Sequence, residues 1–174
     1  MSRLILLSIA VLSVGTPASA DVVARHADGF TLRYGVALET TPDDILTALG
    51  NLPNWWDGAH TYSGSADNLS MSLAPGGCWC EALADGKTFE HARVVSVDPA
   101  GKVVMNAPLG PLSGTATRAD LTYSWAPEDR AWRVTVDFAV EGPGLGGMAD
   151  AVDGVMQAGF ERLARYIETG KPTP

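Results

Sequence analysis

The stretch that decides the fold is LGGMADAVDGVMQAGFERLARYI, residues 145–167, near the end of the sequence. Apolar side chains recur along it at spacings of three and four residues, which is the repeat of one face of an α-helix. Gly170 and Pro172 then end the pattern, as residues beyond a helix commonly do. The apolar face consists of Leu145, Met148, Ala149, Val152, Val155, Met156, Phe160, Leu163 and Ile167. A long amphipathic helix is therefore predicted, and it needs an apolar surface to cover.

Most of the chain before this helix is predicted to form β-strands. Apolar and polar side chains alternate in segment after segment, the repeat of a strand with one buried face. Turn residues separate the segments and every connection is short, so neighbouring strands are expected to be antiparallel. The expected strands are residues 30–38, 69–73, 78–83, 88–97, 103–107, 119–125 and 132–141.

Two short helical pieces are expected after the first strand. Thr41 fits an N-cap and Pro42 the first helical position, and two aspartates follow in the first turn. Gly50 ends this helix, and residues 52–56 form a second short helical or irregular piece. This order predicts an α+β fold, with a curved antiparallel sheet of about seven strands wrapped around the C-terminal helix. A single helix rarely fills such a sheet, so an apolar cavity is expected between them.

The first twenty residues have the three regions of a secretory signal peptide. Arg3 is positive, residues 4–14 are apolar, and Ala18-Ser19-Ala20 fits an A-x-A cleavage site, which predicts a mature chain from Asp21. The apolar run is too short to span a bilayer of roughly 30 Å, so no stable membrane insertion is expected after cleavage. An uncleaved anchor or a buried N-terminal helix is the alternative. Residues 21–174 have the length of one domain, expected in the periplasm or secreted.

The composition and the motifs limit which partners and cofactors are expected. The chain carries 12 Lys and Arg against 20 Asp and Glu, a formal net charge of −8. Because phosphate neutralisation dominates nucleic-acid affinity, nucleic acid is not an expected partner, and an anionic membrane surface is disfavoured for the same reason. The glycine-rich residues 142–147 lack the βαβ unit of a dinucleotide loop, and the sequence contains neither a P-loop nor a G-x-S-x-G motif. No cofactor is expected.

Short stretches spread along the chain have a pattern in common with one superfamily. They are residues 54–56 with 62–64 (NWW and YSG), 74–81 (APGGCWCE), 90–99 (EHARVVSVDP), 152–155 (VDGV) and 163–170 (LARYIETG). Together they resemble the START or birch-pollen-allergen-like superfamily, also called SRPBCC, which includes polyketide-cyclase-like members. The resemblance extends over nearly all of residues 21–174 and implies the helix-grip fold.

The resemblance implies less about function, because the superfamily includes lipid carriers, polyketide cyclases, hormone receptors and chaperone ATPase activators. The expected function is that of an exported protein that holds a hydrophobic or lipid-like molecule between the sheet and the C-terminal helix. The alternative is a polyketide cyclase-like or hydrolase-like enzyme that uses the same cavity. An interaction module is a third hypothesis, which export disfavours because its chaperone partner would be cytosolic.

A hairpin around Asp85-Gly86 decides which side chains reach the cavity. With a two-residue turn, Cys80 faces His91 and Cys78 faces Arg93. The residues of the expected inner face are Cys78, Cys80, Phe89, His91, Arg93, Val95 and Val97, with Trp79, Glu81 and Glu90 on the outer face. A β-bulge in the hairpin would reverse part of this assignment.

Cys78 and Cys80 are expected to be buried free thiols. In an extended strand these side chains lie about 6.6 Å apart along the chain, whereas a disulfide needs Cβ atoms about 3.8 Å apart. A bridge therefore requires local distortion. Two thiols and the imidazole of His91 are ligand types that bind zinc or copper. A nucleophilic Cys–His pair is the other hypothesis for these residues. No fourth ligand is evident from the sequence, so no metal is expected.

The candidate site residues follow from these assignments. If the protein is an enzyme, the candidate catalytic residues are His91, Arg93 and Cys80. An inward Arg93 needs a partner, either a ligand carboxylate or an internal one from Glu81 or Asp137. The predicted ligand-binding residues are Tyr34, Trp55, Trp56, Cys78, Cys80, His91, Arg93, Tyr123, Met148, Val152 and Met156. For the aromatic and apolar ones, plain core packing is the alternative.

Overall fold

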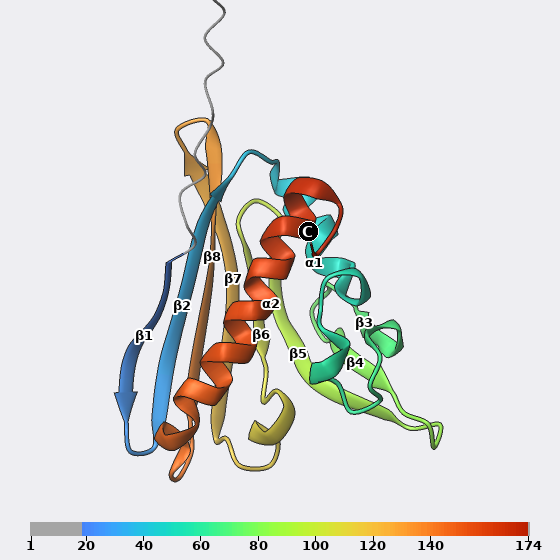
Figure 1. Cartoon of the computed structure of the whole chain (residues 1–174), viewed down its shortest axis with the longest axis vertical. Coiled ribbons are helices and arrows are strands. Elements are labelled where there is room, and N and C mark those ends of the chain that lie inside the picture. The colour runs from blue at the N-terminus through green and yellow to red at the C-terminus, as the bar shows by residue number, and fades with distance from the viewer. Residues whose placement is uncertain (1–18, 174) are drawn as a thin grey trace, which may run out of the picture.

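The structure, a computed structural model, describes residues 19–173. An antiparallel sheet with strand order β1-β2-β8-β7-β6-β5-β4-β3 curves around one long helix, α2 (Ala149–Thr169), as Figure 1 shows. The strands are β1 (Ser19–His26), β2 (Gly29–Leu38), β3 (Leu69–Met71), β4 (Cys78–Ala82), β5 (Thr88–Asp98), β6 (Lys102–Asn106), β7 (Arg118–Glu128) and β8 (Ala131–Glu141). The predicted α+β class and the curved antiparallel sheet are confirmed, but the sheet has eight strands rather than seven.

β1 has no counterpart among the strands expected from the sequence. It forms the edge of the sheet against β2, and among residues 22–26 only Val22 is partly buried. Because a half-buried alternating pattern is what identifies a strand locally, a mostly exposed edge strand escapes detection. β1 begins at Ser19, inside the expected signal peptide, of which residues 1–18 lie outside the described residues. The signal peptide stays a prediction.

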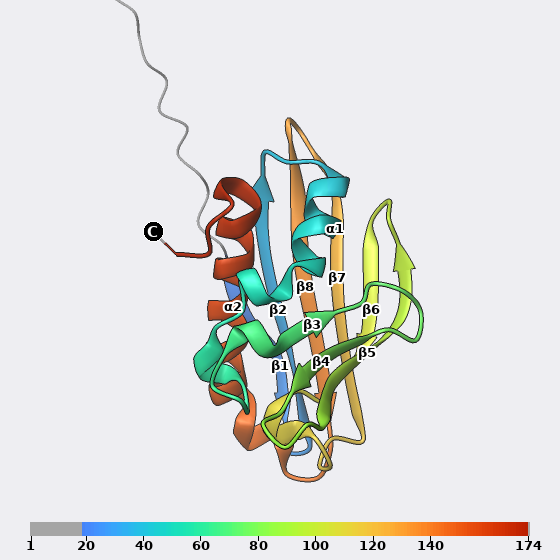
Figure 2. The same ribbon diagram turned by 90° about the vertical axis from the view of Figure 1, so that its right-hand side faces the viewer.

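The helical segment after β2 forms as expected. Helix α1 (Pro42–Gly50) starts at Thr41, whose Oγ1 accepts a hydrogen bond from the backbone N–H of Asp44 at 3.2 Å. Three single 3₁₀ turns follow: η1 (Leu52–Asn54), η2 (Gly58–His60) and η3 (Ala66–Asn68). In the side view of Figure 2, these turns connect α1 to the β3–β4 end of the sheet.

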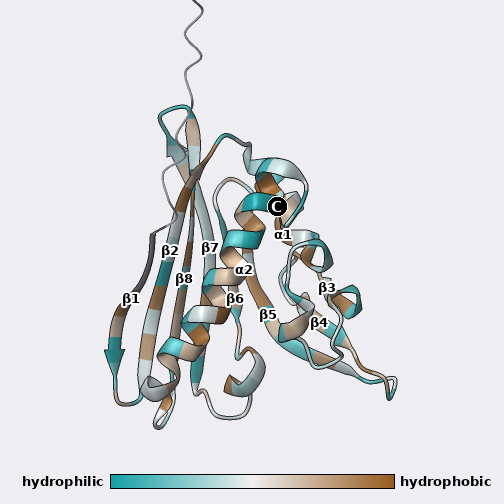
Figure 3. Ribbon diagram, in the orientation of Figure 1, coloured by the Kyte–Doolittle hydropathy of each residue, from teal (hydrophilic) through white to brown (hydrophobic). Residues whose placement is uncertain are grey.

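Helix α2 covers the concave face of the sheet and follows a short 3₁₀ turn, η5 (Leu145–Met148). Apolar and polar residues alternate along it in Figure 3, because one side of the helix faces the core. Phe160 packs on Tyr34 of β2, with ring centroids 5.8 Å apart. Gly170 ends the helix in the left-handed region, at φ 70°, as expected for a glycine C-cap. Within residues 19–173, no helix is both long and apolar enough to cross a membrane.

The β4–β5 hairpin differs from its predicted register. Residues 84–86 form a three-residue loop, closed by a hydrogen bond from the N–H of Leu83 to the carbonyl of Lys87 at 2.8 Å. The pairs are Ala82 with Thr88, Glu81 with Phe89, Cys80 with Glu90, Trp79 with Ala92 and Cys78 with Arg93. The register is thus one residue off next to the loop, and a bulge at His91 restores it from Ala92 onward.

This bulge and a second one change which side chains of β5 face the core. β5 shifts against β6 between Val94 and Ser96, which leaves Val95 unpaired and 58% exposed. His91, Ala92 and Val94 are buried, whereas Arg93 is exposed. The predicted inner face is therefore correct for His91 but wrong for Arg93 and Val95, because strict alternation fails at each bulge.

The one-residue difference in register next to the loop also reverses which side chains of β4 face inward. Trp79 and Glu81 are fully buried on the inner side, although the two-residue turn predicts them outside. Cys78 and Cys80 therefore lie on the opposite side of β4 and form a disulfide. The prediction of free thiols is wrong. Their Cα atoms are 5.4 Å apart, within the range of about 4.4–6.8 Å that a disulfide requires. The local distortion that a bridge needs is supplied where β4 meets the bulge of β5.

Candidate functional site

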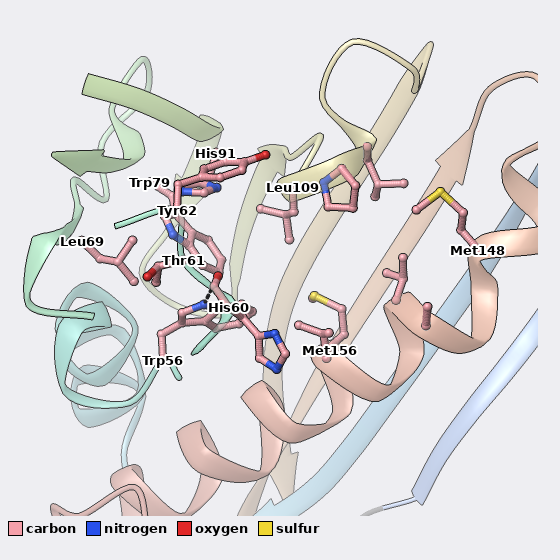
Figure 4. A pocket seen from close by; sticks show the side chains of 16 residues that line it. Trp56, His60, Thr61, Tyr62, Leu69, Trp79, His91, Leu109, Met148 and Met156 are labelled. Carbon is pink, nitrogen blue, oxygen red and sulfur yellow. Dashed lines mark hydrogen bonds between the residues drawn. The ribbon is translucent and has the colours of Figure 1, made fainter. Parts of the chain in front are cut away.

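A cavity of about 340 Å³ lies between α2 and the β3–β5 end of the sheet (Figure 4). This volume is near the lower end of the roughly 300–1,000 Å³ typical of small-molecule sites. The lining residues are Trp56, His60, Thr61, Tyr62, Leu69, Trp79, His91, Leu109, Gly110, Pro111, Leu112, Met148, Ala151, Val152, Val155 and Met156. Most of them are apolar or aromatic, and none is Lys, Arg, Asp or Glu.

One end of the cavity is wholly apolar. Met148, Val152 and Met156 follow one another at four-residue spacing, so η5 and α2 present them on the same side. In Figure 4, Leu109 lies across from Met148 and Met156. It precedes the 3₁₀ turn η4 (Gly110–Leu112), whose residues also line the cavity. The side chains at this end offer a ligand only hydrocarbon and thioether contacts.

The other end is built from indole rings. Trp56 and Trp79 meet edge to face, with ring centroids 4.7 Å apart, and Trp55 packs behind both. Arg162 of α2 fixes this wall from the helix side, because its Nε donates to the carbonyl oxygen of Trp55 at 2.7 Å. Trp56 in turn donates from Nε1 to the carbonyl oxygen of His60 at 3.3 Å. The wall is thus held by the protein's own hydrogen bonds.

A buried carboxylate lies behind this wall. Glu81 has no exposed surface, and its Oε2 lies 2.7 Å from Nε2 of His91. The carboxylate also accepts hydrogen bonds from the backbone N–H groups of Tyr62, at 3.1 Å, and Ser63. Glu81 therefore ties together β4, β5 and the loop after η2.

The environment of Glu81 favours its ionised form. Burial, the largest single influence, raises the pKa of the carboxyl, but hydrogen bonds from Ser63, His91 and Tyr62 together outweigh it and hold the pKa below its ordinary value. A carboxylate can only accept hydrogen bonds, so the proton between the two side chains resides on Nε2 of His91. The carboxylate therefore orients the imidazole in the cavity wall.

Aromatic rings enclose the imidazole of His91. The ring of Tyr62 stacks on it, at 5.6 Å between centroids and 12° between planes, and Phe89 meets it edge to face at 4.8 Å. His91 is 5% exposed, while Tyr62 stands at the rim and is largely exposed. His60 is exposed and also lines the cavity.

The structure brings five of the predicted ligand-binding residues together in the cavity. They are Trp56, His91, Met148, Val152 and Met156. Tyr34, Trp55 and Tyr123 are buried in the core without lining the cavity. Burial raises the pKa of both tyrosines, and Tyr34 donates from its hydroxyl to Oδ1 of Asp153 at 2.7 Å.

The remaining predicted site residues lie on the far side of the sheet. Cys78 and Cys80 are bridged there, so the thiol-based metal site and the Cys–His nucleophile are excluded. Arg93 is exposed, pairs with Glu90 and donates to the carbonyl oxygen of Gly76 at 2.8 Å. It faces away from the cavity because the bulge at His91 turns it outward. Of the three candidate catalytic residues, only His91 faces the cavity.

Several lining residues were not among the predicted ones. Val155 belongs to the predicted apolar face of the helix, and Tyr62 lies in a stretch that resembles the superfamily. Trp79 would follow from the correct hairpin register. Residues 60–61 and 109–112 lie in or beside single 3₁₀ turns, which are too short for a periodic pattern to indicate which side chains turn inward.

The sequence matches no protein-family model and no curated protein. Solved structures, however, match the fold. The solution structure of the Aha1 dimer from Colwellia psychrerythraea matches with a TM-score of 0.60 and 14% identity over 81% of this chain and 98% of that one. CalU16 from Micromonospora echinospora matches with a TM-score of 0.59 and 10% identity over 89% and 88% of the two chains.

A third match is DynU16, described as a putative protein in the dynemicin biosynthetic locus. Its TM-score is 0.57 and its identity 22%, over 82% of this chain and 48% of that chain. The chain therefore shares its fold with these three solved structures. This chain spans about half the length of DynU16. At these identities the likeness establishes the architecture, and the function rests on the residues of the cavity.

Proposed function

We propose that this protein binds a hydrophobic small molecule in the cavity between α2 and the β3–β5 end of the sheet. The observation that carries the proposal is the cavity of about 340 Å³ with its apolar lining. Apolar surface that a ligand removes from water contributes about 25 cal/mol per Å². A ligand that fills this space gains that contribution along its whole length.

The lining favours an uncharged ligand. No Lys, Arg, Asp or Glu lines the cavity, so a charged ligand would find no partner of opposite charge. The buried carboxylate of Glu81 is already satisfied by Tyr62, Ser63 and His91. An apolar body with few polar atoms fits these conditions best.

The cavity is also preorganised for binding. Arg162 holds the carbonyl of Trp55, and Glu81 holds the loop at Tyr62 and Ser63, so two parts of the structure around the cavity are anchored. Fewer side chains have to be ordered when the ligand arrives, which lowers the entropic cost of binding.

The experiment for this proposal begins with native mass spectrometry of the purified protein, which detects a co-purifying small molecule by its added mass. Binding is then measured by the fluorescence of N-phenyl-1-naphthylamine, an uncharged apolar dye. Ala151→Trp places an indole at the opening of the cavity, and we expect it to lower dye affinity at least tenfold. Glu161→Trp introduces the same side chain at an exposed position of α2 away from the cavity and serves as the control. Equal dye binding by both folded variants would contradict the proposal.

Export to the periplasm or the medium is part of the proposed function. It is supported by the charged, apolar and A-x-A regions of residues 1–20. The measurement is intact mass or N-terminal sequencing of the protein recovered from outside the cytoplasm. We expect a chain that begins at Asp21, and a full-length cytoplasmic chain would contradict export.

A second candidate function is a polyketide cyclase-like or hydrolase-like enzyme. One observation favours it, namely that the buried Glu81 orients His91 in the cavity wall, as carboxylates orient histidines that act as general bases. A catalytic role predicts that His91→Gln abolishes turnover of a bound substrate while leaving its binding intact. Turnover that survives this substitution would exclude the imidazole as the base.

A further inference from the structure

We propose that the Cys78–Cys80 disulfide holds Trp79 forward in the cavity wall, and that reduction of this disulfide by a dithiol weakens ligand binding. This inference rests on the proposed function, since it names a form of regulation of the same site. Trp79 is the one residue between the two cysteines, and it lines the cavity from β4. A single residue thus connects the disulfide on the outer side of β4 to the shape of the cavity on its inner side.

The disulfide shortens β4 on its outer side. The Cα atoms of Cys78 and Cys80 are 5.4 Å apart, whereas two residues of an extended strand advance about 6.6 Å. Consecutive Cα atoms stay about 3.8 Å apart across a trans peptide, so the Cα atom between the two moves sideways when they approach each other. For these lengths, the Cα atom of Trp79 stands about 0.8 Å farther from the line between its neighbours than in an extended strand. The displacement is inward, because Trp79 points away from the disulfide and into the cavity wall.

The indole of Trp79 is held in place by packing and by its own backbone. The neighbouring indoles, those of Trp55 and Trp56, each donate from Nε1 to a backbone carbonyl oxygen. Nε1 of Trp79 is enclosed and has no hydrogen-bond partner among the described residues. The ring of Trp79 therefore follows its backbone when β4 moves, and so do its contacts with Trp56 and with a ligand.

The neighbours of β4 leave it room to extend. On one side, only the three residues of β3, Leu69–Met71, pair with it. On the other side, the bulge of β5 at His91 lies between the partners of Trp79 and Cys80. A bulge disrupts the ladder locally, so the backbone at Trp79 is less firmly fixed than in a regular sheet. The disulfide is the covalent restraint that keeps this part of β4 short.

Reduction removes that restraint. A dithiol supplies two electrons and two protons, so the S–S bond breaks, Cys78 and Cys80 become thiols, and the dithiol closes to its own disulfide. Cys78 is partly exposed on the outer side, where a reductant reaches the bridge without entering the cavity. β4 then extends, and Trp79 withdraws by up to about 0.8 Å. A gap of about 0.5–1 Å forfeits roughly a quarter to a half of a van der Waals contact, so the ligand is held less tightly.

The first test measures the affinity for N-phenyl-1-naphthylamine before and after reduction with dithiothreitol, with the redox state of each sample established by alkylation and mass spectrometry. We expect the reduced protein to bind the dye at least threefold more weakly. The double variant Cys78→Ser with Cys80→Ser should bind as weakly as the reduced protein, with or without dithiothreitol. Equal affinities in the two redox states, or a bridge that dithiothreitol leaves intact in the folded protein, would overturn this inference but not the proposed function. Failure of both forms to bind the dye would overturn both.

The second test asks whether the effect passes through the indole of Trp79. In Trp79→Leu the ring is gone, so we expect weaker dye binding and equal affinities of the oxidised and reduced forms. Trp125→Leu is the matched control, because Trp125 is buried outside the cavity, and it should keep the wild-type ratio of the two affinities. If Trp79→Leu also keeps that ratio, the inference is wrong.

The third test needs no variant, so it decides even where a substitution prevents folding. Because the coupling of two equilibria is reciprocal, a ligand that prefers the bridged form also favours the bridge by the same factor. The wild-type protein is equilibrated in mixtures of reduced and oxidised dithiothreitol, with and without saturating dye, and its bridged fraction is measured by alkylation and mass spectrometry. We expect the dye to raise the ratio of bridged to reduced protein at least threefold. An unchanged ratio would overturn the inference.

Discussion

Gly159 of α2 lies directly against the indole of Trp56. A Cβ atom added at Gly159 would come within 2.6 Å of Cζ3 of Trp56, closer than any real contact allows. The helix can therefore approach the cavity wall only because this position has no side chain. Trp56 lines the cavity, so this contact couples the position of α2 to the shape of the site.

Gly159→Ala is expected to destabilise the protein, although alanine is the better helix former by about 1 kcal/mol. The added methyl forces Trp56 aside, and overpacking of this kind costs about 1–3 kcal/mol. The control is Gly154→Ala in the same helix, where a Cβ meets nothing within 4 Å and a gain in stability is expected. Urea denaturation measures both, and an equal gain in the two variants would show that α2 does not press on Trp56.

The stability of the fold is expected to depend on the ionisation of Glu81. Its pKa in the folded state lies below its ordinary value of 4.5, so the folded state binds this proton less readily than the unfolded chain. The resulting stabilisation is present above that ordinary value and is lost as the pH falls through the lower folded-state pKa. Free energies of unfolding measured between pH 7 and about pH 3 should show this loss.

Glu81→Gln should flatten that pH dependence and cost stability at neutral pH. The amide cannot satisfy the N–H groups of Tyr62 and Ser63 and also accept from His91, and each buried group left unpaired costs roughly 1–3 kcal/mol. Glu168→Gln, at an exposed position near the end of α2, is the control and should change neither quantity. An unchanged acid slope in Glu81→Gln would refute the assignment.

The Cys78–Cys80 disulfide is expected to contribute little to stability. It closes a loop of only three residues, for which chain entropy accounts for about 1.5 kcal/mol. The double variant Cys78→Ser with Cys80→Ser should therefore remain folded and lose no more than about 2 kcal/mol. Alkylation followed by mass spectrometry should find no free thiol before reduction and two after it. Two thiols alkylated in the unreduced folded protein would contradict the bridge.

Arg162 is expected to matter for the cavity more than its place on the helix surface suggests. Arg162→Met removes the hydrogen bond to the carbonyl of Trp55, which we expect to cost roughly 1–3 kcal/mol and to weaken dye binding several-fold. Arg165→Met changes an exposed arginine of the same helix that touches neither tryptophan, and it should have little effect. Thermal unfolding and dye titration of both variants provide the comparison.

Local patterns predicted the parts of the fold in which the backbone is regular. β7 and β8 pair without interruption along their whole length, so strict alternation correctly assigned Leu121 and Phe138 to the buried side. The three- and four-residue repeat likewise placed Met156 and Leu163 of α2 in the core. In these elements each residue's direction follows from its neighbours in the chain.

The sequence by itself thus determined the α+β architecture, the N-cap at Thr41 and the helix that covers the sheet. Tertiary structure alone decided that Trp79 and Glu81 face inward, that Arg93 faces outward and that the two cysteines are bridged. The physical reason is that a β-bulge forms where a strand must satisfy both of its neighbours at once. β5 is paired with β4 on one side and β6 on the other, and no local repeat in its own residues records where the two registers conflict.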